Sequence, residues 1–441
     1  MNYSKKYLKM EKDKLDELYL LKGEERLLKY IYPIHYIREY ISKQKNIELN
    51  FLLNYLQKEL HELLNSFLNG GYSLKGFILY PIIKDISLGN VKKMKMLIDI
   101  IQFLTNNGYN FSNSIGKFNK INNFNSNNFA SLLSELYKDF RLAKKASTKL
   151  KSKNKLKGFN IKNFKKDLIY IQPLANLQNY VNRKLKNELL AFYLHGSFAT
   201  DDYVKGWSDV DIFAIVDKEI VENSKLLLEL RDKFYIQRKF FLQIDPLQHH
   251  GCMIISECDL DYYPETFFPI NAMNYAKSLL DADNVNKIKV RSSIYESINT
   301  FFWFVNYFRK LHIEKIYRMN SYSTKFFLHS ITLFPTLYLQ ARGINVYKKH
   351  SFQAAKKDFP KELWKPIEKV EKIRRNWVPL KVLPFVKTFA YINPMLWYQI
   401  NSKFFNISKS NNINVKYLAE EMHKTSDYAW DKIKKELNQN V

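Results

Sequence analysis

The chain has 441 residues, of which 46% are hydrophobic and 15% aromatic, and its formal net charge is +27. This hydrophobic content is sufficient for buried cores and excludes global disorder, and the length indicates two or three domains. The charge favours a nucleic acid or another anionic partner. It carries modest weight, because the sequence is rich in Lys, Asn, Ile, Phe and Tyr together, while Arg, which binds phosphate in a bidentate way, is scarce beside Lys.

Two cysteines, Cys252 and Cys258, exclude a disulfide framework and a four-cysteine zinc site. Charged residues interrupt the first 21 residues throughout, unlike the apolar core of a signal peptide. The apolar runs are shorter than the roughly 20 residues that a membrane helix requires. We therefore expect a cytoplasmic protein without a membrane partner.

The N-terminal part of the chain is predicted to be helical. Apolar residues recur at three-to-four spacing in segments such as 25–41 and 49–68, and we assign residues 1–143 to an N-terminal helical region. The following segment, Lys144–Lys166, contains ten lysines and no acidic residue. We expect a solvated linker over residues 144–176, and the alternative is an arm that binds a polyanion.

A central segment has the pattern of a small mixed sheet. Four strands are predicted, at residues 189–197, 209–217, 238–246 and 251–256, with helices before the first and between the second and third. The chain becomes helical again from about Asp281. The predicted fold class is therefore α+β, with a small mixed β-sheet core at 177–275 flanked by N-terminal and C-terminal helical domains, the latter at 276–441.

The most informative stretch runs from Tyr193 to Val216. A strand ends at Gly196-Ser197, where a helix is expected to begin; glycine allows close approach of a phosphate, and amides at a helix start can bind its oxygens. Further on, Asp209 and Asp211 alternate along a strand, so both carboxylates share one face. Two carboxylates on one face suit Mg²⁺, and a pair of metals there could activate a hydroxyl and stabilise a leaving pyrophosphate.

This stretch resembles the nucleotidyltransferase fold of the polymerase-beta superfamily. Leu194-His195-Gly196-Ser197 and Ser208-Asp209-Val210-Asp211-Ile212 match the family pattern of an apolar residue, Gly, Gly or Ser, about ten residues, and then Asp-x-Asp between apolar residues. The resemblance implies that Asp209 and Asp211 bind Mg²⁺ in a two-metal site, and that Gly196, Ser197 and Ser208 bind the nucleotide.

The same family usually has a third carboxylate on a later strand, and Asp245 is the candidate. In that role it would accept the proton of the acceptor hydroxyl or bind the second metal. The alternative is a turn aspartate, which Pro246 favours. His249 and His250 follow; one of them lines the acceptor or phosphate pocket, or both are turn residues. His195 is expected to be structural and directed away from the phosphate.

A second resemblance covers Leu337–Trp377, which is similar to the helical domain of the aminoglycoside adenylyltransferases. A helix, a Gly turn, a Lys, Ala354-Ala355 and a Pro precede a further helix. The resemblance implies that Lys348 or Lys349 lies near the nucleotide phosphates. The alternative is a pair of exposed lysines at a helix start.

These features together predict a Mg²⁺-dependent nucleotidyltransferase that transfers a nucleoside monophosphate, AMP from ATP in the first instance, to a hydroxyl and releases pyrophosphate. The C-terminal resemblance favours a small-molecule acceptor, and the charge favours RNA as the next choice. A different class is a nucleic-acid-binding module of the toxin–antitoxin type, with an Arg and a His a few residues apart in a helical domain. Arg309 and His312 are too close, and Arg342 and His350 too far apart, for that pattern.

Overall fold

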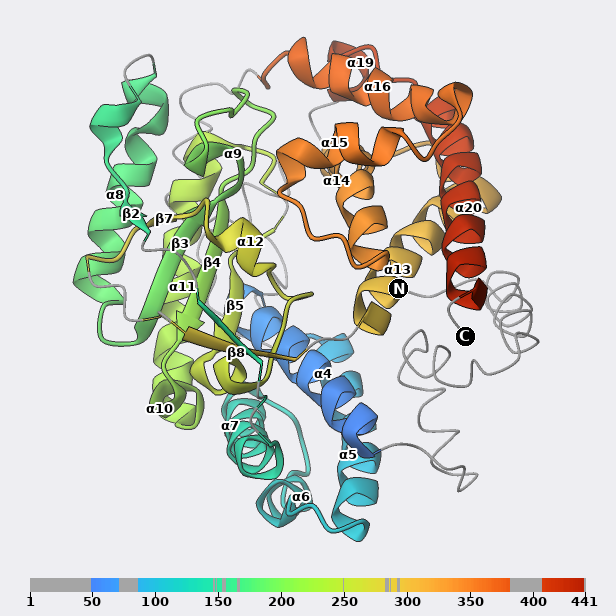
Figure 1. The fold of residues 1–441 in the computed structure, drawn as a ribbon. Coiled ribbons are helices and arrows are strands. Elements are labelled where there is room, and N and C mark those ends of the chain that lie inside the picture. Colours follow the sequence, from blue (N-terminus) through green and yellow to red (C-terminus); the bar gives the residue numbers. More distant parts are fainter. Residues whose placement is uncertain are drawn as a thin grey trace. The chain divides into compact units, whose positions relative to one another are not determined.

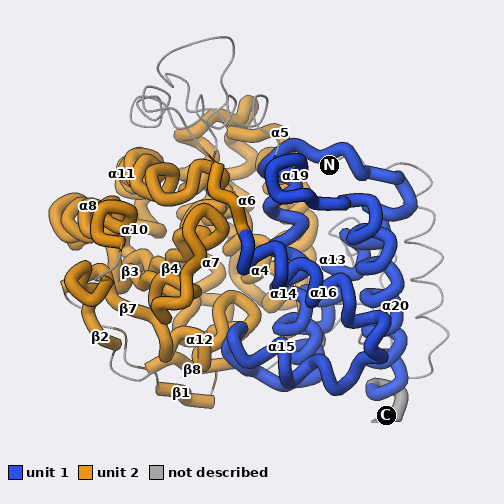
Figure 2. Tube along the Cα trace, turned by 90° about the horizontal axis from the view of Figure 1, so that it is seen from above, with its two compact units in different colours: residues 1–37, 292–376, 406–441 blue, residues 38–291, 377–405 orange. Residues whose placement is uncertain are grey.

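The computed structural model describes most of the chain, in two compact units (Figure 2). Unit 1 comprises residues 1–37, 292–376 and 406–441, and unit 2 comprises residues 38–291 and 377–405. The described residues are 49–70, 86–145, 147, 149–152, 156–164, 167–248, 250–281, 285, 287–291, 294–380 and 407–439. The predicted helix at 25–41 lies outside them, as does His249. The domain boundaries given above remain a prediction.

A five-stranded sheet forms the centre of unit 2 (Figure 1). Its strand order is β2-β7-β3-β4-β5, with β3 antiparallel to β4 and β4 parallel to β5. The strands are β2 (Lys157–Gly158), β3 (Leu189–His195), β4 (Asp211–Val216), β5 (Met253–Ser256) and β7 (Lys277–Ser278). β3 and β4 are almost continuously apolar and buried, as expected for central strands covered on both faces. Three of the four predicted strands are thereby confirmed.

The fourth predicted strand, at 238–246, is wrong, because this segment is the last part of a helix. α11 runs from Ser224 to Ile244. Its N-cap residue is Asn223, whose side chain accepts hydrogen bonds from the amides of Lys225 and Leu226. Its buried residues keep helical spacing to the end, at positions 227, 230, 234, 237, 241 and 244. Consequently the described residues between α11 and β5, 245–248 and 250–252, contain no strand.

A smaller sheet accompanies the first, and the Lys-rich segment contributes to both. Its strand order is β1-β8-β6, with β1 (Leu150–Ser152) antiparallel and β6 (Tyr263–Pro264) parallel to β8 (Lys287–Arg291). The segment predicted as a linker thus supplies β1 here and β2 in the larger sheet. β2 is exposed, whereas Lys151 of β1 is half-buried and forms an ion pair with Glu265 at 2.7 Å.

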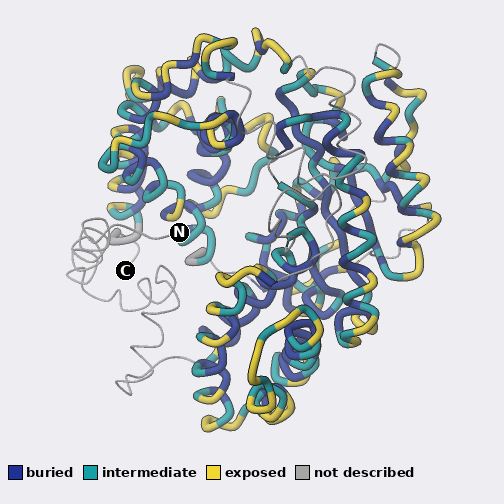
Figure 3. The backbone as a smooth tube through the Cα atoms, turned by 180° about the vertical axis from the view of Figure 1, so that it is seen from behind, coloured by how far each residue is buried: buried dark blue, intermediate teal, exposed yellow. Residues whose placement is uncertain are grey.

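Helices surround the sheets of unit 2, and the buried residues gather on the strands and the inner helix faces (Figure 3). α4 packs against α5, α7, α11 and β5, while α11 also packs against α7 and α8. The helix predicted at 49–68 is confirmed as α4. The helices are α4 (Leu49–Asn69), α5 (Leu88–Asn106), α6 (Ser112–Phe118), α7 (Ser126–Ala143), η1 (Ile161–Asn163), α8 (Leu168–Lys184), α9 (Gly196–Ala199), α10 (Lys218–Val221), η2 (Glu257–Tyr262) and α12 (Ile270–Met273).

Helix α4 covers the edge strand of the large sheet with two asparagines one turn apart. Asn65 accepts a hydrogen bond from the Ile254 amide at 2.8 Å and donates to the Ile254 carbonyl at 2.6 Å. Asn69 makes the same pair of bonds with Cys252, at 2.9 and 2.6 Å. Each side chain therefore replaces a missing neighbouring strand, and α4 protects an edge that could otherwise pair with another chain.

Replacing Asn65 or Asn69 with Ala is expected to lower the free energy of unfolding by about 1–3 kcal/mol each. The reason is that the amide and the carbonyl of Ile254 in β5, or of Cys252 just before it, lose their partner. Chemical denaturation of the full-length protein, with unfolding monitored by fluorescence, measures the change. Asn179→Ala, an exposed asparagine of α8, is the matched control and should change little. Equal effects at Asn179 and Asn65 would contradict the edge-covering role.

His61 of α4 makes the stability of unit 2 depend on pH. Its ring stacks on Phe267 at 3.9 Å between centroids, and burial lowers the pKa of the imidazole to about 4. Unfolding restores a value near 6.5. The unfolded chain therefore takes up a proton that the folded chain does not, and stability falls as the pH decreases from 6.5 toward 4.

Replacing His61 with Phe, which keeps the stacked ring, should remove this contribution. The difference between the two pKa values corresponds to at most about 3 kcal/mol. The difference in the free energy of unfolding between the wild type and His61→Phe, measured by denaturant unfolding at pH 4 and at pH 7.5, gives the effect directly. Parallel pH profiles for the two proteins would show that His61 is not responsible.

Unit 1 is helical in its described part. α13 packs against α14 and α20, α14 packs against α15 and α16, and α16 packs against α20. The helical character predicted for the C-terminal region is confirmed from Ile294 onward, whereas β7 and β8, which lie within the predicted range 276–441, are strands of unit 2. Among the described residues, no helix combines the length and apolarity needed to cross a membrane. The helices are α13 (Ile294–Ile313), α14 (Ser321–Ala341), α15 (Lys348–Lys356), α16 (Lys361–Arg375), α19 (Ile407–Ser410) and α20 (Val415–Gln439).

Candidate active site

The turn at Gly196 brings the end of β3 against the start of β4. β3 ends at His195, which is the partner of Asp211 in the antiparallel register, and α9 begins at Gly196 as predicted. Gly196 has a φ of +68°, in the left-handed region that residues other than glycine rarely adopt. A Cβ atom at this position would overlap the carboxylate of Asp211. Glycine therefore serves two purposes here: it forms the turn and it leaves room for Asp211. Ser197 follows as the second residue of α9 and is half-buried.

Val210 lies between the two aspartates, and one side chain hydrogen-bonds both its amide and its carbonyl. Gln248 accepts a hydrogen bond from the Val210 amide at 2.9 Å and donates to the Val210 carbonyl at 3.1 Å. With Val210 fixed and buried, Asp209 and Asp211 both project to the opposite side, as expected for alternating residues. The Asp209 side chain is 3% exposed and that of Asp211 is 31% exposed.

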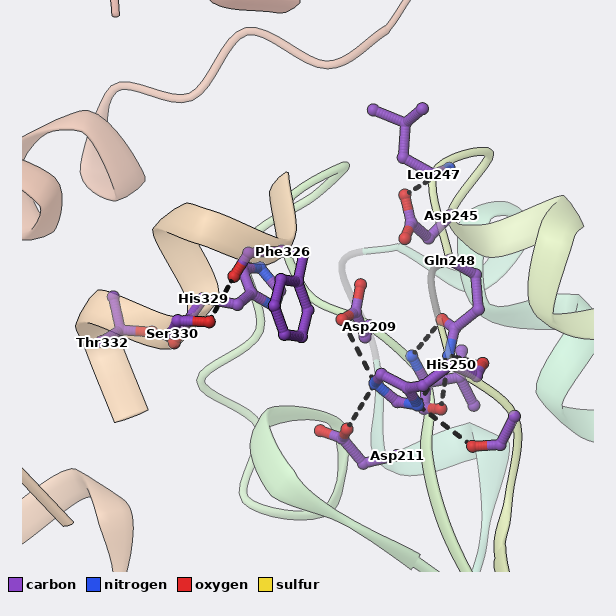
Figure 4. Close-up of polar contacts among 12 residues, drawn as sticks. Asp209, Asp211, Asp245, Leu247, Gln248, His250, Phe326, His329, Ser330 and Thr332 are labelled. Atoms are coloured by element: carbon purple, nitrogen blue, oxygen red, sulfur yellow. Dashed lines mark hydrogen bonds and ion pairs between the residues drawn. The ribbon is translucent and has the colours of Figure 1, made fainter. Parts of the chain in front are cut away.

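His250 lies between the two carboxylates (Figure 4). Its Nε2 is 3.3 Å from Asp209 Oδ2 and 3.3 Å from Asp211 Oδ1. Burial opposes the charged imidazolium, but hydrogen bonds and charge from both aspartates outweigh it and raise the pKa of His250 well above its usual value. For Asp211, burial is likewise outweighed, by the hydrogen bond to His250 and by the charges of His195 and His250, so that its pKa is lowered. The site therefore holds one positive group between two negative ones.

Asp245 lies in the turn that leaves α11. It is the C-cap residue, its carboxylate accepts a hydrogen bond from the Leu247 amide at 3.0 Å, and its carbonyl accepts one from the Gln248 amide at 3.0 Å. Asp245 thus occupies a turn rather than a strand. Burial above all, and then the charges of Asp245, Asp167 and Asp209, raise the pKa of Tyr170. Figure 4 shows the side chains of Asp245 and Asp209 in the same part of the site.

The loop before Asp209 is fixed by several contacts within unit 2. Ser208 is buried, and its hydroxyl accepts a hydrogen bond from the Val204 amide at 2.9 Å. The Gly206 amide donates to the Tyr170 hydroxyl at 3.1 Å, and Trp207 packs edge-on against Trp377 with ring centroids 5.0 Å apart. These contacts hold the main chain that carries Asp209.

The other candidate residues have separate surroundings. The ring of His195 packs on Phe268 at 4.5 Å between centroids. Lys348 and Lys349 are exposed at the start of α15 in unit 1. The C-terminal pattern of a helix, a glycine turn and a further helix is present in α14, Gly343 (φ +76°) and α15.

Two residues of the site were not identified from the sequence. Gln248 belongs to no motif, and its hydrogen bonds join it to a residue 38 positions away. His250 was left open between a functional and a turn role. The signal that could have singled it out is its place next to β5, since β5 is the parallel neighbour of β4 and their register begins at Phe213 and Met253.

The donor set fits a divalent cation by charge and by atom type. Asp209 and Asp211 direct carboxylate oxygens at a single positive group, and oxygen ligands of this kind suit Mg²⁺. Within the part of the chain that the structure describes, no group of three or more His, Cys, Asp or Glu side chains is arranged around a common metal position. The imidazole nitrogen of His250 itself lies where the two carboxylates converge.

Comparison with known proteins adds one match. Residues 174–247 match the family model described as a nucleotidyltransferase domain. The matched range includes Gly196, Ser197, Asp209, Asp211 and Asp245 and ends before Gln248 and His250. No curated protein matches the chain, and no solved structure does.

Proposed function

Because residues 174–247 form a nucleotidyltransferase domain and the chain is accordingly a transferase, we propose that it transfers a nucleoside monophosphate from a Mg²⁺-bound nucleoside triphosphate, ATP in the first instance, to a hydroxyl group. The observation that carries this proposal is the convergence of the Asp209 and Asp211 carboxylates on one position, beside the Gly196 turn, where the imidazole of His250 now pairs with both. Carboxylates that neutralise a cation next to a glycine turn are what a metal-bound triphosphate needs.

The reaction is a substitution at the α-phosphorus. The acceptor oxygen forms a bond to this phosphorus, the bond to the oxygen that bridges the α- and β-phosphates breaks, and pyrophosphate leaves. Mg²⁺, when bound, polarises the phosphoryl oxygens and neutralises the charge of the leaving group. Asp209 and Asp211 would hold the metal, and the main chain of Gly196 together with Ser197 would bind phosphate oxygens.

Other residues have proposed supporting roles. Asp245 would accept the proton of the acceptor hydroxyl or supply a third carboxylate, which its burial in the same part of the site as Asp209 supports (Figure 4). Ser208 would help to bind the nucleotide, and Lys348 or Lys349 would neutralise the charge of its phosphates. Gln248 would hold Val210, and with it the spacing of the two aspartates.

A small hydroxylated molecule is the proposed acceptor, and RNA is the second candidate. The succession of α14, the Gly343 turn, α15 and α16 agrees with the helical pattern of enzymes that act on small molecules. RNA is favoured by the 70 basic residues against 43 acidic ones.

The test offers purified full-length protein a labelled nucleoside triphosphate and Mg²⁺ with a panel of RNAs, sugars and aminoglycosides. A labelled small molecule, formed at a rate that changes little with salt, supports the first acceptor class. A labelled RNA, with binding that weakens steeply as salt increases, supports the second. A protein that binds no Mg²⁺–nucleotide and labels no acceptor would refute the proposed function.

A further inference from the structure

The loop that joins the Gly196 turn to the aspartate pair carries one positive charge. Between Gly196 and Asp209 the only basic residue is Lys205, and its side chain is exposed. Asp201 of the same loop pairs with Lys277 on β7, at 3.3 Å. Lys205 itself forms no ion pair with any residue that the structure describes. The loop therefore presents a cation whose charge is not neutralised by a described carboxylate.

The side chain of Lys205 is held over an aromatic ring. Its Nζ lies 4.9 Å from the centre of the Tyr170 ring in α8, within the range of a cation–π interaction. The hydroxyl of the same tyrosine accepts a hydrogen bond from the amide of the next residue, Gly206, at 3.1 Å. Tyr170 thus positions both the ammonium group and the main chain beside it. Because the contact with the ring is electrostatic, the N–H donors of the ammonium group stay available for another acceptor.

Tyr170 belongs to an aromatic cluster that joins α8 to α9. Its ring lies 6.1 Å from that of Tyr203, which stacks on Phe198 at 4.8 Å between centroids. The Tyr203 hydroxyl donates a hydrogen bond to Asp167, the N-cap residue of α8, at 2.9 Å. Since Phe198 directly follows Ser197 in α9, the cluster ties Tyr170 to the turn that is proposed to bind phosphate.

The loop closes in a tight turn just before Asp209. The Val204 carbonyl accepts hydrogen bonds from the amides of Trp207 and Ser208, at 3.0 and 2.9 Å, and the Val204 amide donates to the Ser208 hydroxyl. Lys205 and Asp209 are four residues apart, so even an extended chain would separate their Cα atoms by at most about 14 Å, and the turn shortens this distance. A triphosphate bound beside Asp209 is therefore within the range of a lysine side chain at position 205.

We propose that Lys205 binds the β- and γ-phosphates of the nucleoside triphosphate and stabilises the pyrophosphate as it leaves. The inference rests on the proposed function and adds to it a cation supplied by unit 2. Negative charge accumulates on the leaving group in the transition state, and an ammonium group that is already oriented stabilises this charge without a cost of reorganisation. Lys205 donates hydrogen bonds to phosphate oxygens as a point charge and transfers no proton.

The first measurement is calorimetric titration of the full-length protein with inorganic tripolyphosphate and, separately, with AMP, both in the presence of Mg²⁺. Lys205→Gln should bind tripolyphosphate about tenfold more weakly, the loss expected for one charge-assisted hydrogen bond, and should bind AMP as the wild type does. Lys205→Arg should keep most of the affinity, since a guanidinium group also stacks on aromatic rings and binds phosphate. An equal loss for the two ligands would place Lys205 at the α-phosphate, and no loss for either would remove it from the site; both results contradict the proposal.

Lys95→Gln is the matched control. Lys95 is likewise exposed, and its Nζ lies 5.8 Å from the centre of the Phe124 ring, but it belongs to α5, which packs on α4 and α6. This variant should bind tripolyphosphate with the affinity of the wild type. If the two glutamine variants are weakened equally, then the net charge of the protein determines the affinity and the specific role of Lys205 is refuted.

Transfer kinetics give a second readout of the same contact. Lys205→Gln should lower kcat/KM for the triphosphate about tenfold, and pyrophosphate should inhibit the variant less than the wild type. A wild type that binds neither tripolyphosphate nor a Mg²⁺–nucleotide would refute the proposed function together with this role. A wild type that transfers the nucleotide, with a Lys205→Gln variant that is equally active and equally inhibited by pyrophosphate, would refute the role of Lys205 alone.

Discussion

Replacing Asp209 with Asn should reduce nucleotidyl transfer about a thousandfold while the protein stays folded. The amide has nearly the same shape as the carboxylate but no charge, so the metal loses a ligand in a position that is 3% exposed. Metal binding contributes several kcal/mol of charge stabilisation in the transition state, and each 1.4 kcal/mol corresponds to about a tenfold change in rate. The rate of label transfer from an α-labelled triphosphate in a single turnover measures the effect.

Asp201→Asn is the matched control, since it is the same change on the same loop. Asp201 is exposed, its ion pair with Lys277 spans 3.3 Å, and its φ of +60° is one that Asn tolerates. Exposed ion pairs contribute little, so this variant should transfer at the wild-type rate. Wild-type activity in Asp209→Asn would remove the carboxylate pair from the mechanism.

Gly196→Ala should lower transfer at least about a hundredfold, because a misplacement of roughly 1 Å in a catalytic group has effects of this size. The added Cβ would overlap the Asp211 carboxylate, and the φ of +68° adds backbone strain of about 1–2 kcal/mol. Asp211 must therefore move away from the position that it shares with Asp209. Transfer kinetics and thermal unfolding are measured on the same sample.

Gly108→Ala separates strain from crowding. Gly108 also has a positive φ, of +94°, but a Cβ there would have no atom within 4 Å. This variant should lose a similar amount of stability and keep full activity. If the two alanine variants are equally active, then the space beside Asp211 has no importance for the reaction.

The parts of the site that lie within one local stretch of sequence were predictable. Continuous apolar residues bounded by Gly196 and by Asp209 predicted β3 and β4, and the two-residue spacing of the aspartates predicted their common face. These features depend on strand geometry alone, which sequence spacing reports directly.

The segment at 238–246 was predicted wrongly for a physical reason. Its contiguous apolar residues and the following Pro246 resemble a buried strand, and a short apolar run does not distinguish a strand from the end of a buried helix. The buried positions 230, 234, 237, 241 and 244 extend one helical face from the preceding turns, and the helix therefore continues to Ile244.

The remaining features depend on contacts between distant segments. Asn65 and Asn69 have the spacing of an ordinary polar helix face, and only the fold shows that this face meets the edge of β5. Gln248 and His250 become part of the site because the turn after α11 returns beside Asp209 and Asp211. No local pattern encodes this approach, since it is set by the packing of α11 and by the parallel pairing of β4 with β5.

The most direct test of the reaction compares triphosphates labelled at the α- and at the γ-phosphate, in the presence of a divalent cation and an accepted hydroxyl compound. Nucleotidyl transfer places the α-label on the acceptor and releases the γ-label as pyrophosphate, and Asp209→Asn should suppress both. A γ-label on the acceptor, or transfer of the α-label at the same rate by Asp209→Asn, would contradict the account.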